Sequence, residues 1–361
     1  MKQILRGPRA VISADALRHN LGVVRKLAPR SRVLAIIKAN AYGHGIVPTA
    51  RALQDADAFG VARIEEGTAL RQAGIGNPIL LLEGVFTPQD LALAASANLE
   101  LVVHSFGQLQ LLEQFAGTHR FSIWLKIDTG MHRLGFSPQD FPLAWKRIQR
   151  CPSAAAGARV MTHLAIAEEP VHPLTVRQLQ CFEQAVRGLE TQYSMANSAA
   201  IIGMPQTHLD WVRPGIMLYG ISPLPDKYAA QLDLQPAMTL HSSLIAVHQL
   251  NPGETVGYGA RWRAERSTRI GVAAIGYGDG YPRHARSGAP VCVADRQCLL
   301  AGRVSMDMIN VDLTGAPEAQ AGDSVLLWGP DLPVERIAAY ADTIPYELVC
   351  GISQRVKVQY K

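Results

Sequence analysis

Side chains of the kinds used in catalysis follow several short apolar runs along the chain. Lys38 closes the run RVLAIIK, Lys126 lies within FSIWLKID, and His163 follows a third run. A lysine that ends a buried strand loses hydration unless it is paired, used covalently or extended toward water. So many cations and small polar groups at the ends of consecutive apolar runs are poorly explained by chance. Other such positions hold Asp128, Arg133, Asn197, Ser198 and Arg213.

Two further features suggest an anion site and a second acid–base group. Ser198 follows the seventh apolar run and Gly215 lies after WVRP in the eighth, and barrel enzymes often bind phosphate in this region through a hydroxyl and exposed N–H groups. Tyr258 stands between Gly257 and Gly259, which permit unusual backbone angles and close approach to a ligand. Taken singly, each candidate also fits a structural role: Lys38 extended to solvent, Tyr258 in an ordinary turn, His163 as a hydrogen-bonded structural residue, and Arg213 at the surface.

The first 230 residues alternate short apolar runs with helix-like stretches such as Glu65–Ala73 and Thr175–Glu190. Continuous runs are typical of strands buried on both faces, and roughly eight strand–helix units predict a (β/α)8 barrel of the TIM type, an α/β fold. A doubly wound sheet is the alternative, but no G-x-G-x-x-G follows the first run. In such barrels the active site lies at the carboxyl ends of the strands. The runs are Arg32–Lys38, Ala58–Ala62, Pro78–Glu83, Glu100–His104, Phe121–Asp128, Ala158–Leu164, Gln192–Asn197 and Leu209–Tyr219.

Past about residue 235 the helical patterns thin out, and Gly, Pro, Asn and Asp turns separate the apolar runs. This texture predicts a smaller, mostly β domain, with a helix over Leu332–Thr343 and a final strand over Arg355–Tyr360. We therefore expect a barrel over residues 1–230 and a β domain over residues 231–361, with residues 1–10 available to pair with the β domain. The other expected strands are Met238–Val247, Arg269–Ile275, Pro290–Val293, Cys298–Val304 and Ser324–Trp328.

The composition argues against several classes of protein. The 361 residues are 48% hydrophobic and 18% charged, no window resembles a membrane-spanning helix, and the start, Met1–Arg9, has no signal-peptide pattern. The net charge of +5 includes no dense Lys/Arg run, which disfavours nucleic-acid binding. Five cysteines without C-x-x-C spacing and histidines without a paired motif predict reduced thiols and no metal. We expect a cytoplasmic enzyme that acts on a small molecule.

Seven strings along the chain carry a resemblance to a known family. AIIKANAYGHG at residues 35–45 is followed in order by KIDTGMHRLG at 126–135, WVRPGI at 211–216, GYG at 257–259, GYGDG at 276–280, GRVSMD at 302–307 and PYE at 345–347. One such string would say little, but all of them in order over nearly the whole chain are highly specific. The chain resembles the alanine racemases, which use pyridoxal 5′-phosphate (PLP) and have fold type III.

The resemblance implies a two-base reaction that interconverts L-alanine and D-alanine through a PLP external aldimine. Lys38 matches the lysine that forms the Schiff base with PLP and then stands over one face of the substrate's α-carbon. Tyr258 matches the base on the opposite face, and His163 the partner that hydrogen-bonds it. Members of the family are dimers in which this tyrosine enters the partner's barrel, so a homodimer with a shared site is implied. The product would supply peptidoglycan, or the enzyme would serve alanine catabolism.

The same resemblance assigns the remaining site residues. Arg213 matches the arginine that faces the pyridine nitrogen, and Arg133 the one that contacts the substrate carboxylate. Lys126 matches a lysine that is carbamylated in many relatives. Met306, Asp307 and Tyr277 match the substrate end and its entrance, although Tyr277 and Met306 fit a core role equally well. The cofactor set is Lys38, Tyr42, His163, Asn197, Ser198, Arg213, Gly215, Ile216 and Tyr346.

Two positions depart from the family's usual pattern, and three related activities compete with the prediction. Glu168 stands where relatives usually have Asp, and Glu83 where some have an aromatic residue. A single-barrel PLP-binding homeostasis protein would lack the β domain and Tyr258. A barrel-type amino-acid decarboxylase would show a glycine-rich phosphate loop and a catalytic cysteine. A racemase for serine or a broader set of amino acids remains open on the sequence alone.

Overall fold

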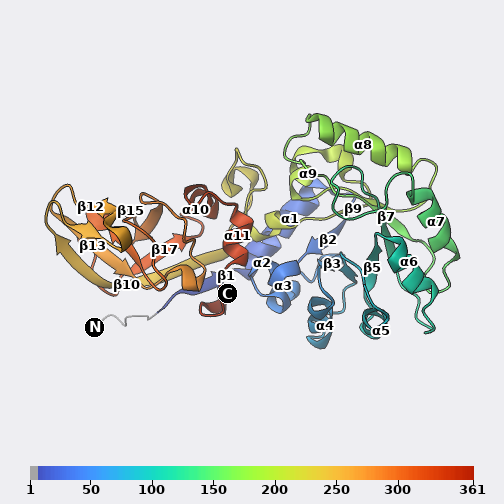
Figure 1. The fold of residues 1–361 in the computed structure, drawn as a ribbon, viewed down its shortest axis with the longest axis horizontal. Helices are drawn as coiled ribbons and strands as arrows, with labels where there is room; N and C mark the ends of the chain where they lie inside the picture. The colour runs from blue at the N-terminus through green and yellow to red at the C-terminus, as the bar shows by residue number, and fades with distance from the viewer. Residues whose placement is uncertain (1–6) are drawn as a thin grey trace.

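The computed structural model describes residues 7–361 and consists of a closed barrel joined to an elongated β domain (Figure 1). Eight parallel strands close the barrel in chain order, which confirms the predicted fold class. The predictions that fall on residues 1–6, their share in pairing with the β domain and the absence of a signal sequence, lie outside the described residues. The barrel strands are β2 (Arg32–Ile36), β3 (Ala58–Val61), β4 (Ile79–Leu81), β5 (Glu100–Val103), β6 (Ile123–Lys126), β7 (Arg159–Met161), β8 (Tyr193–Ser194) and β9 (Trp211–Val212).

Helices cover the outside of the barrel and begin at clear capping residues. Ser13 Oγ accepts a hydrogen bond from the N–H of Ala16 at the start of α1, and Thr87 and Asp90 form a capping box at α5. The strands themselves are almost wholly buried, as their continuous apolar composition predicts. The helices are α1 (Ala14–Leu27), α3 (Ile46–Ala52), α4 (Ile64–Gln72), α5 (Pro88–Ser96), α6 (Phe106–Glu113), α7 (Phe141–Arg150), α8 (Pro173–Ala185) and α9 (Ser198–Gly203).

The barrel strands are shorter than the apolar runs that predict them. Lys38 is the first residue of α2 (Lys38–Tyr42) rather than the last residue of a strand, and Tyr219 ends the short helix η2 (Ile216–Tyr219). The reason is that an apolar run stays buried after its strand has ended, because residues at the top of the barrel turn inward and remain covered. Burial continues where the sheet hydrogen bonds stop.

The β domain is built on one eight-stranded sheet that contains both ends of the described chain. β10 (Met238–Leu250) is its long central strand, which pairs with β1 (Arg9–Ile12), β13 (Thr268–Ala273) and β17 (Ser324–Trp328). β1 also pairs in parallel with β18 (Lys357–Tyr360), so residues 9–12 belong to this sheet although they precede the barrel. The remaining strands of the sheet are β14 (Pro290–Val293), β15 (Arg296–Leu300) and β16 (Ile309–Asp312).

Two short helices of the β domain lie between the sheet and the barrel. α10 (Val334–Tyr340) is followed by α11 (Pro345–Cys350), which lies beside α2 of the barrel in Figure 1. One apolar core runs through the barrel and most of the β domain, so the two parts share buried contacts. Within residues 7–361, none of the helices combines the length and apolar character needed to cross a bilayer.

Candidate functional site

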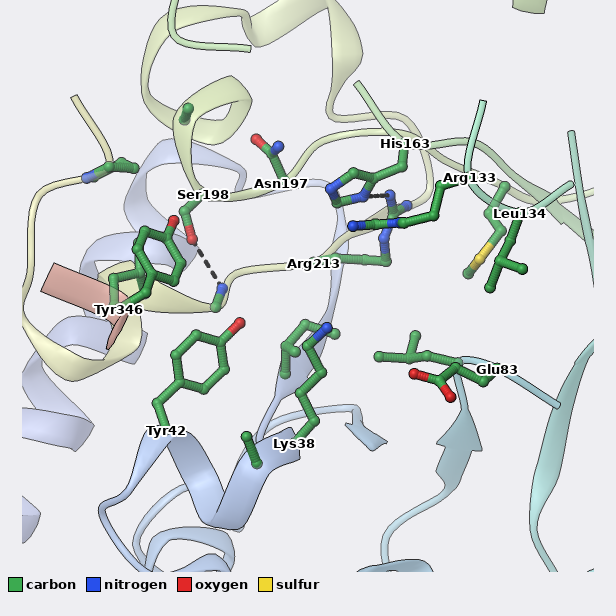
Figure 2. A pocket seen from close by; sticks show the side chains of 18 of the residues that line it. Lys38, Tyr42, Glu83, Arg133, Leu134, His163, Asn197, Ser198, Arg213 and Tyr346 are labelled. Carbon is green, nitrogen blue, oxygen red and sulfur yellow. Dashed lines mark hydrogen bonds between the residues drawn. The ribbon is translucent and has the colours of Figure 1, made fainter. Parts of the chain in front are cut away.

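A cavity of about 510 Å³ is lined by residues at or just beyond the carboxyl ends of the barrel strands (Figure 2). This is where the fold predicts an active site. The structure gathers here most of the candidate residues that the sequence singles out within the barrel, and it adds Tyr346 from α11. The candidates on the cavity wall are Lys38, Tyr42, Lys126, Arg133, His163, Asn197, Ser198, Arg213, Gly215, Ile216 and Tyr346.

An unusual backbone conformation follows Lys38. Ala39, Asn40, Ala41 and Tyr42 all have positive φ angles, between 51 and 54°, and so form a short left-handed turn. For residues with a side chain this costs about 1–2 kcal/mol each, so the surroundings must stabilise it. The N–H of Asn40 donates to Glu66 Oε1 at 3.2 Å, and Asn40 Oδ1 accepts from Ile46 N at 2.9 Å. Figure 2 shows the Lys38 side chain rising into the cavity from this turn.

Four cations, Lys38, Lys126, Arg133 and Arg213, line the cavity, and the pKa values of the two lysines are lowered there. Burial lowers the pKa of Lys38, and the charge of Arg133 lowers it further, whereas Glu83 opposes the shift. Burial, then the charges of Arg213, Arg133 and Lys38, lower the pKa of Lys126 to about 8. Both amines therefore have a larger neutral fraction near neutral pH than a free lysine, and a neutral amine can act as a base or a nucleophile.

Arg213 is buried beneath this cluster and held by a set of acceptors. Nη1 donates to Ser194 Oγ at 2.7 Å, and Nη2 donates to the carbonyl oxygen of Thr162 at 2.5 Å and to His163 Nδ1 at 3.3 Å. Burial lowers the pKa of Arg213 to about 10, which leaves it protonated at neutral pH. It can therefore donate hydrogen bonds into the cavity but gives up no proton there.

His163 is neutral in this environment. Burial and the neighbouring charge of Arg213 hold the pKa of His163 well below its usual range. Because a guanidinium only donates, Nδ1 of His163 accepts the hydrogen bond from Arg213, and the imidazole proton lies on Nε2. The ring thus presents an N–H donor that is available to another group.

A cradle suited to a phosphate lies on the other side of Lys38. Gly215 N donates to Ser198 Oγ at 2.8 Å, and a Cβ added at Gly215 would lie 2.7 Å from the Tyr42 hydroxyl. Only glycine leaves this space free. Burial raises the pKa of Tyr42, and burial followed by the charge of Glu168 raises that of Tyr346 to about 12, so both phenols stay protonated as donors. Two O–H donors, Ser198 and the space over Gly215 fit an anionic phosphate.

The remaining candidates lie in the β domain, away from this chain's own cavity. Tyr258 begins η4 (Tyr258–Ala260), between β11 (Thr255–Val256) and β12 (Trp262–Arg263), and is 68% exposed. Tyr277 and Met306 are 41% and 53% exposed, so they are not core residues of this chain. Asp307 forms an ion pair with Arg355. The structure of a single chain does not bring these four side chains to Lys38.

Other wall residues carry no signal by which the sequence alone could have placed them. Cys350 reaches the cavity only because α11 packs against α2, a contact between segments about 310 residues apart. Glu83 and Glu168, noted only as departures from a family pattern, both line the wall. Glu83 is held at the rim because its carbonyl oxygen accepts from Gln108 Nε2 at 2.9 Å. Also on the wall are Leu82, Leu134, Met161, Thr162 and Pro223.

Comparison with known proteins agrees with this arrangement. The family model "Alanine racemase, N-terminal domain" matches residues 12–223, and "Alanine racemase, C-terminal domain" matches residues 237–360. An alanine racemase of Nitrosococcus oceani is 54% identical over 350 residues, which cover 97% of this chain and 98% of the relative. One of Aeromonas hydrophila is 50% identical over 351 residues, with the same coverage. The crystal structure of the biosynthetic alanine racemase from Pseudomonas aeruginosa has a TM-score of 0.96 at 44% identity, covering 99% of this chain and 100% of that chain.

Proposed function

Because the chain belongs to the alanine racemase family, we propose that it interconverts L- and D-alanine with PLP held at Lys38 and with two bases, Lys38 and the Tyr258 of a second copy. The observation that carries the proposal is the cavity itself. An amine of lowered pKa stands between a cradle for phosphate and a buried, protonated arginine. These are the three contacts that a phosphorylated pyridine aldehyde needs.

The cofactor would be held by residues of both domains. Tyr42, Ser198 and Gly215, with Ile216 and Tyr346, would bind the phosphate, and Arg213 would donate a hydrogen bond to the ring nitrogen. Asn197 lines the same wall, where its Oδ1 caps the start of α9. When bound, PLP withdraws electrons from the substrate's α C–H bond and so makes that proton removable.

The two bases act on opposite faces of the α-carbon. Lys38 removes or delivers a proton on one face, and its lowered pKa increases the fraction of neutral amine available for this. Inversion requires a group on the other face as well. Tyr258 is exposed on its own chain and flanked by glycines, which suits insertion into a second copy's barrel. The N–H of neutral His163 would hydrogen-bond its oxygen there. We therefore propose a homodimer with a site shared across the interface.

Substrate binding would rest on Arg133 and on the state of Lys126. The planar fork of Arg133 suits the carboxylate of alanine. We propose that Lys126 becomes carbamylated, since a lysine of pKa about 8 has neutral amine available for CO2 and the resulting anion would hold Arg133 in place. Met306, Asp307 and Tyr277 of the second copy would close the substrate end. A pocket bounded by these side chains favours alanine over larger amino acids.

We propose the physiological role from a related structure. One similar structure is that of a biosynthetic alanine racemase, which favours supply of D-alanine for peptidoglycan over alanine catabolism. We propose the cytoplasm as the location of the enzyme. Its five cysteines, all within residues 7–361, form no disulfide with one another, which suits a reducing compartment.

The proposal is tested by proton exchange at the α-carbon. The wild-type enzyme and Tyr258→Phe are incubated with L-alanine or D-alanine in deuterated buffer, and loss of the α-proton is followed by NMR. We expect the variant to lose exchange from one enantiomer far more than from the other, because only one face loses its base. Equal loss from both would count against two face-specific bases. Borohydride reduction followed by peptide mass spectrometry should place the cofactor on Lys38.

A further inference from the structure

We propose that Arg355 is a positioning residue for the surface that one copy lends to the other's site, and that its charge prevents Asp307 from repelling the substrate carboxylate. The inference rests on the proposed function, which places Asp307 at the second copy's substrate end. Arg355 lies just before β18 and outside the cavity of its own chain.

Three segments of the β domain converge at this residue. The N–H of Tyr277 donates to Ser305 O at 3.0 Å, and that of Gly278 donates to Met306 O at 2.9 Å. These two hydrogen bonds join the turn at 276–280 to the turn at 303–308. Ser353 N donates to Asp279 O at 3.1 Å and adds the segment that precedes β18. The three proposed substrate-end residues therefore belong to one connected platform.

The platform is packed closely enough to require glycine at Gly276, and Gly278 leaves room for the end of the Arg355 side chain. A Cβ at Gly276 would lie 2.3 Å from Met306 O, and a Cβ at Gly278 would lie 2.4 Å from Arg355 Nη1. Close backbone contact of this kind allows little independent movement of the turns. The guanidinium of Arg355 fills the remaining space against Gly278.

Two carboxylates, one buried and one exposed, flank the Arg355 guanidinium. Nε lies 3.3 Å from Asp279 Oδ1, and Nη2 lies 2.6 Å from Asp307 Oδ1. The Asp279 side chain is only 3% exposed, and its Oδ2 also accepts from Gly276 N at 2.9 Å. The Asp307 side chain is 52% exposed. Arg355 thus joins a fixed internal carboxylate to one that faces outward, and this contact orients Asp307.

The electrostatic consequence concerns the substrate. Alanine brings a carboxylate to the site, and an unpaired Asp307 facing it would repel it. The contact with Arg355 compensates that charge and keeps the carboxylate turned toward its own chain. Loss of Arg355 should therefore weaken substrate binding more than it slows the proton transfers, because neither base touches it.

The test uses the full-length holoenzyme and compares Arg355→Gln with the double variant Arg355→Gln/Asp307→Asn. For the single variant we expect KM for alanine to rise roughly fivefold with kcat changed less than twofold, since the exposed pair acts on the substrate's charge and neither base touches Arg355. Removing the carboxylate as well should lower KM below that of Arg355→Gln, because the unpaired charge that repels the substrate is then absent. Arg355→Lys, which keeps the charge, should stay close to wild type, as should the matched surface control Arg296→Gln.

Different results would contradict the proposed racemase function and the proposed role of Arg355. If the wild-type enzyme does not racemise alanine, the proposed function fails. If it does, but Arg355→Gln leaves KM unchanged or the double variant has a KM no lower than that of Arg355→Gln, Arg355 has only a structural role and the inference is wrong. Should Arg355→Gln fail to fold because Asp279 is left uncompensated, the same pair of variants is compared in an Asp279→Asn background, where the buried carboxylate is absent.

Discussion

The cations at the two ends of the barrel differ in whether they have ion-pair or aromatic partners. At the amino ends of the strands, Arg159 lies 3.0 Å from Glu100 Oε2 and 5.1 Å from the centre of the Trp124 ring, and Arg32 lies 5.4 Å from the centre of the Trp211 ring. Trp124 Nε1 also donates to Glu100 at 3.0 Å. Both of these arginines therefore have a partner within the chain.

The cations at the carboxyl end lack such partners. Within residues 7–361, no salt bridge joins Lys38, Lys126, Arg133 or Arg213 to a carboxylate. Their mutual repulsion and burial lower the pKa of both lysines. The amino end therefore stabilises the fold, whereas the carboxyl end holds positive charges without an ion-pair partner, which suits anionic ligands. Substitutions at the first end should reduce stability, and those at the second should reduce function.

The largest expected effect is that of Lys38→Ala. Racemase kcat should fall by at least about 10⁴-fold, because the variant lacks both the attachment point of the cofactor and one base. The free energy of unfolding should stay the same or rise, since a buried cation is removed. Steady-state kinetics and urea unfolding measure both quantities. A variant that loses stability in parallel with activity would contradict the assignment of this end to function.

Gly215→Ala should have the next largest effect. The added methyl would lie 2.7 Å from the Tyr42 hydroxyl, within the proposed phosphate cradle. We expect the Kd for PLP to rise by about a hundredfold, or roughly 3 kcal/mol. Fluorescence titration of the apoenzyme with PLP measures it. Gly76→Ala, at a surface glycine with open space around it, is the matched control and should bind PLP normally.

Arg159→Met tests the opposite end of the barrel. The change leaves the half-buried Glu100 without its cation and removes the contact with Trp124, so we expect a loss of about 2 kcal/mol in the free energy of unfolding. The kcat should remain within twofold of wild type. Arg32→Gln, at a cation that only stacks on an indole, should cost about 0.5–1 kcal/mol. If Arg159→Met lowered kcat strongly and left the free energy of unfolding unchanged, the amino end would not have the purely stabilising role proposed here.

A further expected effect is the pH dependence of stability that Lys126 produces. The pKa of Lys126 in the folded chain, about 8, lies below the ordinary value of 10.5, so the unfolded chain binds more protons between these values and stability should rise with pH across that window. In the CO2-free apoenzyme, the free energy of unfolding of wild type relative to Lys126→Met should increase by about 1–2 kcal/mol between pH 7.5 and 9.5. Urea unfolding at the two pH values measures it, and a constant difference would show that the amine is not perturbed.

The order of barrel strands and the residues at their ends follow from local features of the sequence. Parallel strands covered on both faces require continuous apolar runs, and the polar residue after such a run falls at the top of the barrel. Lys38, His163 and Arg213 could be placed on this basis. The change in texture near residue 235 likewise predicts a separate β domain, because short strands between turn residues leave a recognisable pattern.

The features of the site that depend on contacts between distant segments were decided only by the tertiary structure. Ala39 and Ala41 have no local preference for a left-handed turn, which exists because contacts such as the one between Asn40 N and Glu66 stabilise it. The approach of Tyr346 and Cys350 to Lys38, and the pairing of Arg355 with Asp279 and Asp307, join residues that are far apart or lie on different turns. Such contacts leave no periodic signal in the sequence, because their free energy comes from packing that exists only once the chain has folded.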